Sequence, residues 1–246
     1  MRKMQQNLLV CSLLFSVGIT GCTSDAKVPE LGSHLATVSV VAIDRTEGMH
    51  MAAPGIQIAE RLIRQAKPGD QMTFQWISDI SYSRQEVVAT LEIPMNTLQK
   101  PNQYDIQGKR AYAAAVKSQR REEAQAKLTT IEMLRSQNCL LPTSSTDLIG
   151  AMQSAVERLS AADNAVRKEM ILTTDLKDNQ GYAVALDLRD IHIKIFLLSD
   201  ELDPSKVQSL KQQATDQFMS LGAKSVEFPY VNIQSSEPWD EVACAR

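Results

Sequence analysis

The sequence predicts an α/β fold, in which helices cover both faces of a doubly wound, mostly parallel central sheet. Two observations support this fold class. Apolar, β-branched runs alternate along the chain with segments of helical spacing, and the central runs are nearly continuous, as in strands buried on both faces. A ligand of such a sheet binds beyond the carboxyl ends of the strands, so the polar residues that follow the apolar runs are the first candidates for a site.

The first half of the sheet is expected to come from three strands. Residues 37–43, Thr-Val-Ser-Val-Val-Ala-Ile, are almost uniformly apolar or β-branched and predict a buried central strand. Residues 56–66 then carry apolar side chains at helical spacing, and a Pro-Gly-Asp turn ends that helix. Two more strands, at 71–77 and 87–93, follow the turn.

The second half of the chain continues the alternation. Further strands are expected at 170–173, 191–198 and 224–230. A short Leu-rich helix is expected near 182–189, between the first two of these strands. Residues 205–221 predict a longer helix that ends at Gly222, because glycine is common just after the last turn of a helix.

A helical insertion, over about residues 100–140, interrupts this pattern after the third strand. Residues 105–136 are rich in Ala, Lys, Arg, Glu and Gln, which predicts one long helix or a pair of helices. The stretch 117–123 is entirely polar and is expected to extend beyond the body of the domain. Two interpretations of the insertion stay open, a solvated helix face and a surface that contacts a partner.

The N-terminus predicts a lipoprotein signal peptide over residues 1–21. Two basic residues precede an apolar run, and the segment ends in Ile-Thr-Gly-Cys, which is similar to a bacterial lipobox. Cys22 is then the acylated first residue of the mature chain, and residues 22–34 are a flexible tether. This predicts a cell-membrane lipoprotein facing the periplasm, with Thr23 favouring the outer membrane. The alternative is an ordinary signal peptide with an incidental cysteine, which would leave the protein without an anchor.

Composition narrows the class of partner. The chain has 26 Lys and Arg against 29 Asp and Glu, a net charge of −3, whereas nucleic-acid-binding proteins usually carry a strongly basic surface. No Gly-rich phosphate loop follows the first expected strand, which argues against a nucleotide, and no G-x-S-x-G motif occurs. The sequence therefore favours a binding protein over an enzyme.

The remaining cysteines point to a disulfide. Once Cys22 is acylated and the signal peptide is removed, Cys139 and Cys244 are left. Two leftover thiols commonly pair in an oxidising compartment, and two free thiols are the alternative. No CxxC motif or Cys/His cluster occurs, which argues against zinc.

Oxygen-bearing side chains come from three distant segments that are expected to meet at the carboxyl edge of the sheet. Asp44 and Thr46 follow the first strand, Thr146 opens a helix, and Asp175 follows the strand at 170–173. Two carboxylates and one or two hydroxyls are sufficient ligands for Mg²⁺, or for Mn²⁺ or Ca²⁺, and a partner's carboxylate can complete the coordination. The alternative is that each residue only stabilises a turn or a helix end.

This arrangement resembles the metal-ion-dependent adhesion site of the von Willebrand factor type A (vWA) family. Asp44 and Thr46 match the first two positions of its Asp-x-Ser-x-Ser motif, Thr146 matches its central threonine, and Asp175 matches its distal aspartate. The resemblance implies a vWA-type fold over residues 35–246 and a role in binding.

Two positions depart from the family pattern, so the site is a degenerate one. Gly48 stands in place of the final serine of the motif, and Leu176 stands where glycine commonly follows the distal aspartate. The first change removes a hydroxyl ligand.

We therefore expect a lipid-anchored envelope protein that binds another protein through a divalent cation at the carboxyl edge of the sheet. One alternative is a metal-free structural scaffold that contacts its partner through the helical insertion. Another is a metal-dependent hydrolase that uses Asp44 and Asp175. Met49, His50 and Met51 could hold a soft metal such as copper, although methionine beside a strand end more often packs in a core.

Overall fold

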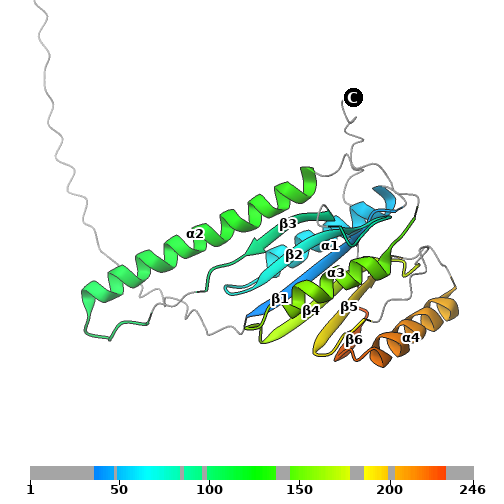
Figure 1. The fold of residues 1–246 in the computed structure, drawn as a ribbon. Helices are drawn as coiled ribbons and strands as arrows, with labels where there is room; N and C mark the ends of the chain where they lie inside the picture. Colours follow the sequence, from blue (N-terminus) through cyan, green and yellow to red (C-terminus); the bar gives the residue numbers. More distant parts are fainter. Residues whose placement is uncertain are drawn as a thin grey trace, which may run out of the picture. The chain divides into compact units, whose positions relative to one another are not determined.

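A central sheet organises the part of the chain that the structure describes, with its strands in the order β3-β2-β1-β4-β5-β6 (Figure 1). In this computed structural model the strands are Thr37–Asp44 (β1), Gln71–Ile77 (β2), Val87–Glu92 (β3), Arg167–Thr174 (β4), Ile191–Leu197 (β5) and Ser225–Glu227 (β6). β3 pairs antiparallel with β2, and every other pairing of these strands is parallel. The expected α/β class with a doubly wound, mostly parallel sheet is confirmed.

The structure describes residues 36–46, 49–83, 86–95, 99–136, 145–177, 186–198 and 203–230, and for 49–51 it describes the backbone alone. All of these belong to one compact unit, Gly32–Arg246. The expected signal peptide, the whole of the expected tether, and Cys22, Cys139 and Cys244 lie outside the described residues, as does Gly48.

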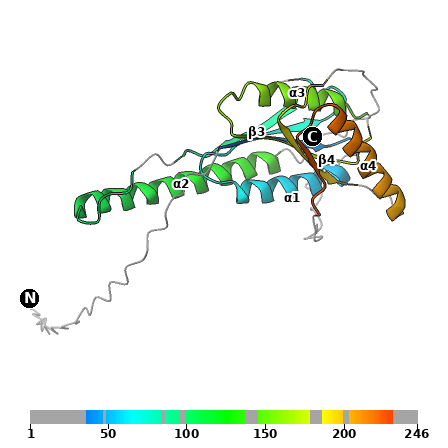
Figure 2. The same ribbon diagram turned by 90° about the horizontal axis from the view of Figure 1, so that it is seen from below.

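Helices lie on both faces of the sheet. In the described ranges they are Met49–Gln65 (α1), Ile106–Ser136 (α2), Leu148–Ser160 (α3) and Pro204–Ser220 (α4). α1 and α2 lie on one side and α3 on the other, as Figure 2 shows. The apolar side chains of α4 pack on the same side as those of α3. Within the described ranges, no helix combines the length and apolar character needed to cross a membrane.

Alternating side chains of β1 divide between the two faces. Val41 and Ile43 pack in the core beneath α1, while Val40 and Ala42 pack in the core beneath α3. All four are buried, which explains why the β1 sequence is apolar at successive positions. The same alternation directs the side chain of Asp44 to the α3 face.

α1 and the helix expected near 182–189 differ from the expectation, and α2 follows one of its two expected forms. α1 begins at Met49 rather than at residue 56, so the Met-His-Met run lies in its first turn, and those side chains are outside the described set. α2 is one continuous helix, the first of the two forms expected for residues 105–136. The prediction of a helix near 182–189 is wrong for residues 186–189, the part that the structure describes. Leu186 and Leu188 are buried but lie in irregular backbone, and Arg189 forms an isolated β-bridge with Ala223.

The leucines at 182–189 suggested a helix, but Leu186 and Leu188 are apolar because they pack in the same core as the side chains of β5. Leu188 N–H donates to the Leu221 carbonyl, so this segment is tied to the end of α4 instead of closing a helical turn. The expected end of α4 is confirmed: Gly222 has φ of 93°, a left-handed conformation that glycine adopts without strain.

Candidate functional site

The carboxyl ends of β1 and β4 meet where the strand order reverses. From β1 the chain continues to β2 on one side, and it later returns to β4 on the other side. Asp44 ends β1 and Thr174 ends β4, and their strands are adjacent and parallel. This is the topological switch point, where open α/β sheets bind ligands.

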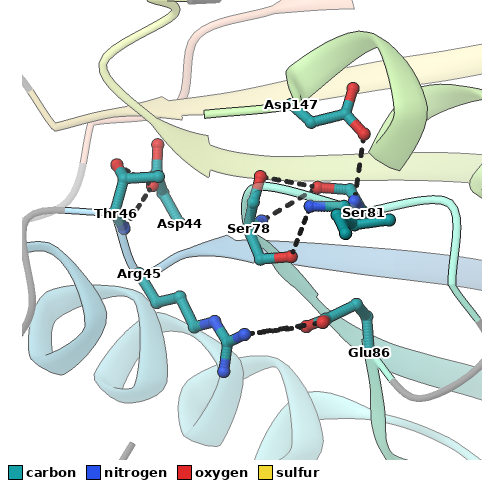
Figure 3. Close-up of polar contacts among 8 residues, drawn as sticks. Asp44, Arg45, Thr46, Ser78, Ser81, Glu86 and Asp147 are labelled. Carbon is teal, nitrogen blue, oxygen red and sulfur yellow. Dashed lines mark hydrogen bonds and ion pairs between the residues drawn. The ribbon is translucent and has the colours of Figure 1, made fainter. Parts of the chain in front are cut away.

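The Asp44 carboxylate lies at this point and is fully buried. Its Oδ1 accepts hydrogen bonds from the Thr46 N–H at 3.0 Å and the Thr46 hydroxyl at 2.7 Å. Its Oδ2 accepts a hydrogen bond from the Thr174 hydroxyl at 2.8 Å. Figure 3 shows Thr46 folded back onto Asp44. The two hydroxyl oxygens therefore lie beside one carboxylate, although Thr174 is 130 residues from Asp44 along the chain.

The charge of Asp44 has no cationic partner among the described residues. Its neighbour Arg45 points away and pairs with Glu86, with Nη2 and Oε2 3.3 Å apart (Figure 3). Three neutral donors form hydrogen bonds with Asp44, but they do not neutralise its charge. A buried carboxylate without a counter-charge is costly, so this one is an unusual feature for a purely structural residue.

The Arg45–Glu86 pair ties the end of β1 to the start of β3. Both side chains are largely buried, at 15% and 14% exposed. Burial raises the pKa of the Glu86 carboxyl, and the Arg45 charge and a hydrogen bond with Ser78 offset part of that rise. Because Arg45 is engaged by Glu86, the basic residue directly after β1 does not compensate the charge of Asp44.

Asp147 forms a second buried polar centre at the start of α3. Its Oδ1 accepts the Gly150 N–H at 2.7 Å, which caps the helix, and its Oδ2 accepts the Ser81 N–H at 3.0 Å. The Asp147 N–H donates to the Ser78 carbonyl at 2.7 Å. Figure 3 shows this carboxylate pointing toward Ser81. Asp147 therefore holds the start of α3 against the loop that follows β2.

The N-cap of α3 is Asp147, one residue after Thr146, which was expected to open this helix. Thr146 is 3% exposed and precedes the cap at the same edge of the sheet. Among the described residues, no hydrogen bond joins it to Asp44. Ser145, Thr146 and Asp147 are all residue types that cap helices well. Asp147 is the one that also contacts the loop after β2, through Ser78 and Ser81.

Asp175, the expected distal carboxylate, follows β4 but turns toward its own loop. Its Oδ1 accepts the Lys177 N–H at 3.0 Å, and its Oδ2 is 2.8 Å from Lys177 Nζ. Thr174, which sequence reasoning passed over, makes the contact with Asp44 instead. The period-two pattern could have identified it, because Met170 and Leu172 pack on the α3 face and Thr174 is the next residue on that face.

Leu176 has a backbone conformation that favours glycine. Its φ is 66°, a left-handed value that costs a residue with a side chain about 1–3 kcal/mol. The Leu176 N–H donates to the Thr174 hydroxyl at 3.1 Å, and its side chain packs against the core beneath α3. The loop after β4 therefore keeps a strained geometry that holds Thr174 in place. Strain of this kind concentrates at functional sites.

The donor set at the switch point fits a hard cation in its chemistry. It consists of oxygens only, and its carboxylate lacks a counter-charge. It offers one carboxylate and two hydroxyls, since Asp175 faces Lys177. Consistent with this small number of acids, no group of three or more His, Cys, Asp or Glu side chains in the described part of the chain is placed to hold a metal.

Comparisons with known proteins identify no relative. No model of a known protein family matches the chain, and a search of curated proteins finds no match. The resemblance to the vWA family therefore depends on the residues and on the fold class.

Proposed function

We propose that this chain is a lipid-anchored cell-envelope protein whose folded domain binds another protein at the carboxyl edge of β1 and β4, through a divalent cation held at Asp44. The observation that carries the proposal is the buried Asp44 carboxylate, which has three neutral donors and no cationic partner among the described residues. A bound cation would supply the missing charge.

The residues that would hold the cation are Asp44, Thr46 and Thr174. Their hydroxyl hydrogens now point to the carboxylate, and rotation about the Cβ–Oγ1 bonds would present the oxygen lone pairs instead. Thr146 and Asp175 border this edge and would complete the site or contact the partner. Mg²⁺ keeps several water ligands, so few protein oxygens are enough and a partner's carboxylate can take one of the remaining positions.

Calorimetric titration of Mg²⁺ and Mn²⁺ tests the cation. The soluble form that begins at Thr23 should bind one ion with a dissociation constant on the order of 10⁻⁴ to 10⁻³ M, the range of extracellular cation modules. Asp44→Asn should abolish this heat, because it removes the charge and keeps the shape. Asp187→Asn, which neutralises an exposed acid paired with Arg189, should leave it unchanged. A silent wild type would contradict the cation.

The stability of Asp44→Asn without metal separates a binding residue from a structural one. Since the carboxylate is buried without a counter-charge, replacing it by an amide should leave the free energy of unfolding in EDTA equal or higher. A structural carboxylate would instead lose about 2–3 kcal/mol, because hydrogen bonds to a charged acceptor are broken.

A metal-free scaffold that uses α2 is the second candidate. Only Val116, Thr130, Ile131 and Leu134 are buried along its 31 residues, so most of the helix surface is available to a partner. If the titration is silent, capture of envelope proteins by the wild type, but not by a chain lacking the first half of α2, would favour this function.

The anchor and the disulfide can be tested by mass spectrometry of the protein isolated from membranes. We expect a triacylated Cys22 at the N-terminus, with palmitate among its chains, and a peptide that joins Cys139 to Cys244. An unmodified N-terminus at another residue would contradict the anchor, and two alkylatable thiols would contradict the bridge.

A further inference from the structure

The first half of α2 carries a concentration of positive charge. Between Ile106 and Arg121 the helix contains five basic residues and no Asp or Glu. They are Lys109, Arg110, Lys117, Arg120 and Arg121, and all five are exposed. The chain as a whole has a net charge of −3, so this half-helix departs from the character of the protein.

These five side chains lie on one side of the helix. At 3.6 residues per turn they fall within an arc of roughly 120°, and they extend over about 18 Å of the helix axis. We call this surface the basic stripe. Figure 1 shows the first half of α2 extending beyond the end of the sheet, while the second half lies beside β3 and α1.

The basic residues in the two halves of α2 differ in their ion pairs. In the second half, Lys127 pairs with Glu123 at 2.6 Å and Arg135 pairs with Glu60 of α1 at 2.6 Å. In the basic stripe, no side chain forms an ion pair with any residue that the structure describes. Arg135, through Glu60, and Lys127, which also donates to the Ala66 carbonyl at 2.6 Å, therefore dock the second half of the helix on the domain, and the bases of the stripe make no such ion pair with described residues.

The stripe does not stabilise the helix either. The positive end of the helix dipole favours acidic residues in the first turn, but the first turn of α2 has none, and it contains Lys109. Neither packing nor helix electrostatics accounts for this arrangement of charges.

We propose that the basic stripe binds the anionic headgroup surface of a phospholipid bilayer. Within the arc of the stripe lies Ala113, whose small side chain lets the charged groups around it approach a flat surface together. Tyr104 and Ile106, at 81% and 67% exposed, lie at the start of the helix and can enter the interfacial region. A row of exposed bases without ion pairs to described residues suits a fluid layer of headgroups, whereas a folded partner would need groups of fixed geometry.

This inference rests on the proposed acyl anchor at Cys22 and is independent of the cation at Asp44. An acyl anchor keeps the domain near the membrane, and a polybasic surface commonly adds a second, electrostatic attachment. The stripe would then fix how the domain is oriented on the bilayer.

Vesicle sedimentation tests the proposal with the soluble form that begins at Thr23, because Gly32–Arg246 forms a compact unit with its own core. The measurement is made in EDTA, so a failure of the cation site cannot affect it. The protein should bind vesicles of phosphatidylcholine with phosphatidylglycerol, should not bind phosphatidylcholine alone, and should dissociate in high salt.

A triple variant, with Lys117, Arg120 and Arg121 changed to Gln, should weaken partitioning about 100-fold, since each base contributes about fivefold. A matched triple variant, with Arg61, Lys206 and Lys211 changed to Gln, loses the same charge elsewhere and should bind within about twofold of the wild type. Equal loss in the two variants, or no dependence on phosphatidylglycerol, would overturn the proposal. Folding of both variants is checked by their unfolding transitions.

Discussion

Replacing Asp147 by alanine is expected to be one of the most destabilising changes at the carboxyl edge of the sheet. Its carboxylate is 7% exposed and has two functions, since Oδ1 caps α3 through Gly150 and Oδ2 accepts the N–H of the fully buried Ser81. Loss of an N-cap costs about 1 kcal/mol. A buried N–H left without an acceptor costs about 1–3 kcal/mol more. We therefore expect Asp147→Ala to lower the free energy of unfolding by about 2–4 kcal/mol.

Urea denaturation followed by circular dichroism measures this loss. Asp203→Ala is the matched control, because Asp203 caps α4 through Ser205 N–H at 2.9 Å but is exposed, so the cost should be about 1 kcal/mol or less. Asp147→Asn keeps one carbonyl oxygen for the cap and loses the acceptor for Ser81, so it should fall between wild type and Asp147→Ala. Equal losses for Asp147→Ala and Asp203→Ala would refute the second function.

Three further predictions concern the rest of the domain. A Cβ at Gly55 would lie 2.5 Å from Ile43 Cγ2, so Gly55→Ala should destabilise the protein by about 1 kcal/mol or more despite its better helix propensity; a gain in stability would contradict this. Glu60 and Arg135 join α1 to α2, and a double-mutant cycle should give a coupling of about 1 kcal/mol, with additive losses as the opposing result. Burial lowers the pKa of His192 below 6.5, so the contribution of this residue to stability is present above pH 6.5 and is lost as the pH falls through the lowered value. The free energy of unfolding should therefore decrease between pH 7.5 and 5, and His192→Gln should remove this part of the decrease.

Much of the sheet follows from sequence alone, because hydrophobic pattern determines burial. The run at 71–77 coincides with β2, and the apolar run at 37–43 predicts β1 to within one residue. Both have side chains that must be buried, and strand pairing is then the simplest way to satisfy their backbone groups. The hydrophobic pattern did not predict where α1 begins, because its first turns contain Pro54, and proline usually argues against the interior of a helix.

The site was predictable only in part, because side-chain partners depend on tertiary contacts. The sequence identified Asp44 and Thr46 and their position at the edge of the sheet, and the structure joins these two by hydrogen bonds. It did not reveal that Thr174 rather than Asp175 reaches Asp44, because that choice depends on the pleat of β4 and on Lys177. The acyl anchor, the cation and the partner remain proposals.

Paramagnetic broadening by Mn²⁺ tests the central claim most directly, because it reports where an ion binds. In a spectrum of the soluble protein, Mn²⁺ should broaden the backbone signals of Thr46, Thr174 and Leu176, and it should leave those of His192, at the opposite end of the sheet, sharp. The same titration of Asp44→Asn should broaden none of them. Broadening that avoids the ends of β1 and β4, or that persists in Asp44→Asn, would contradict the account.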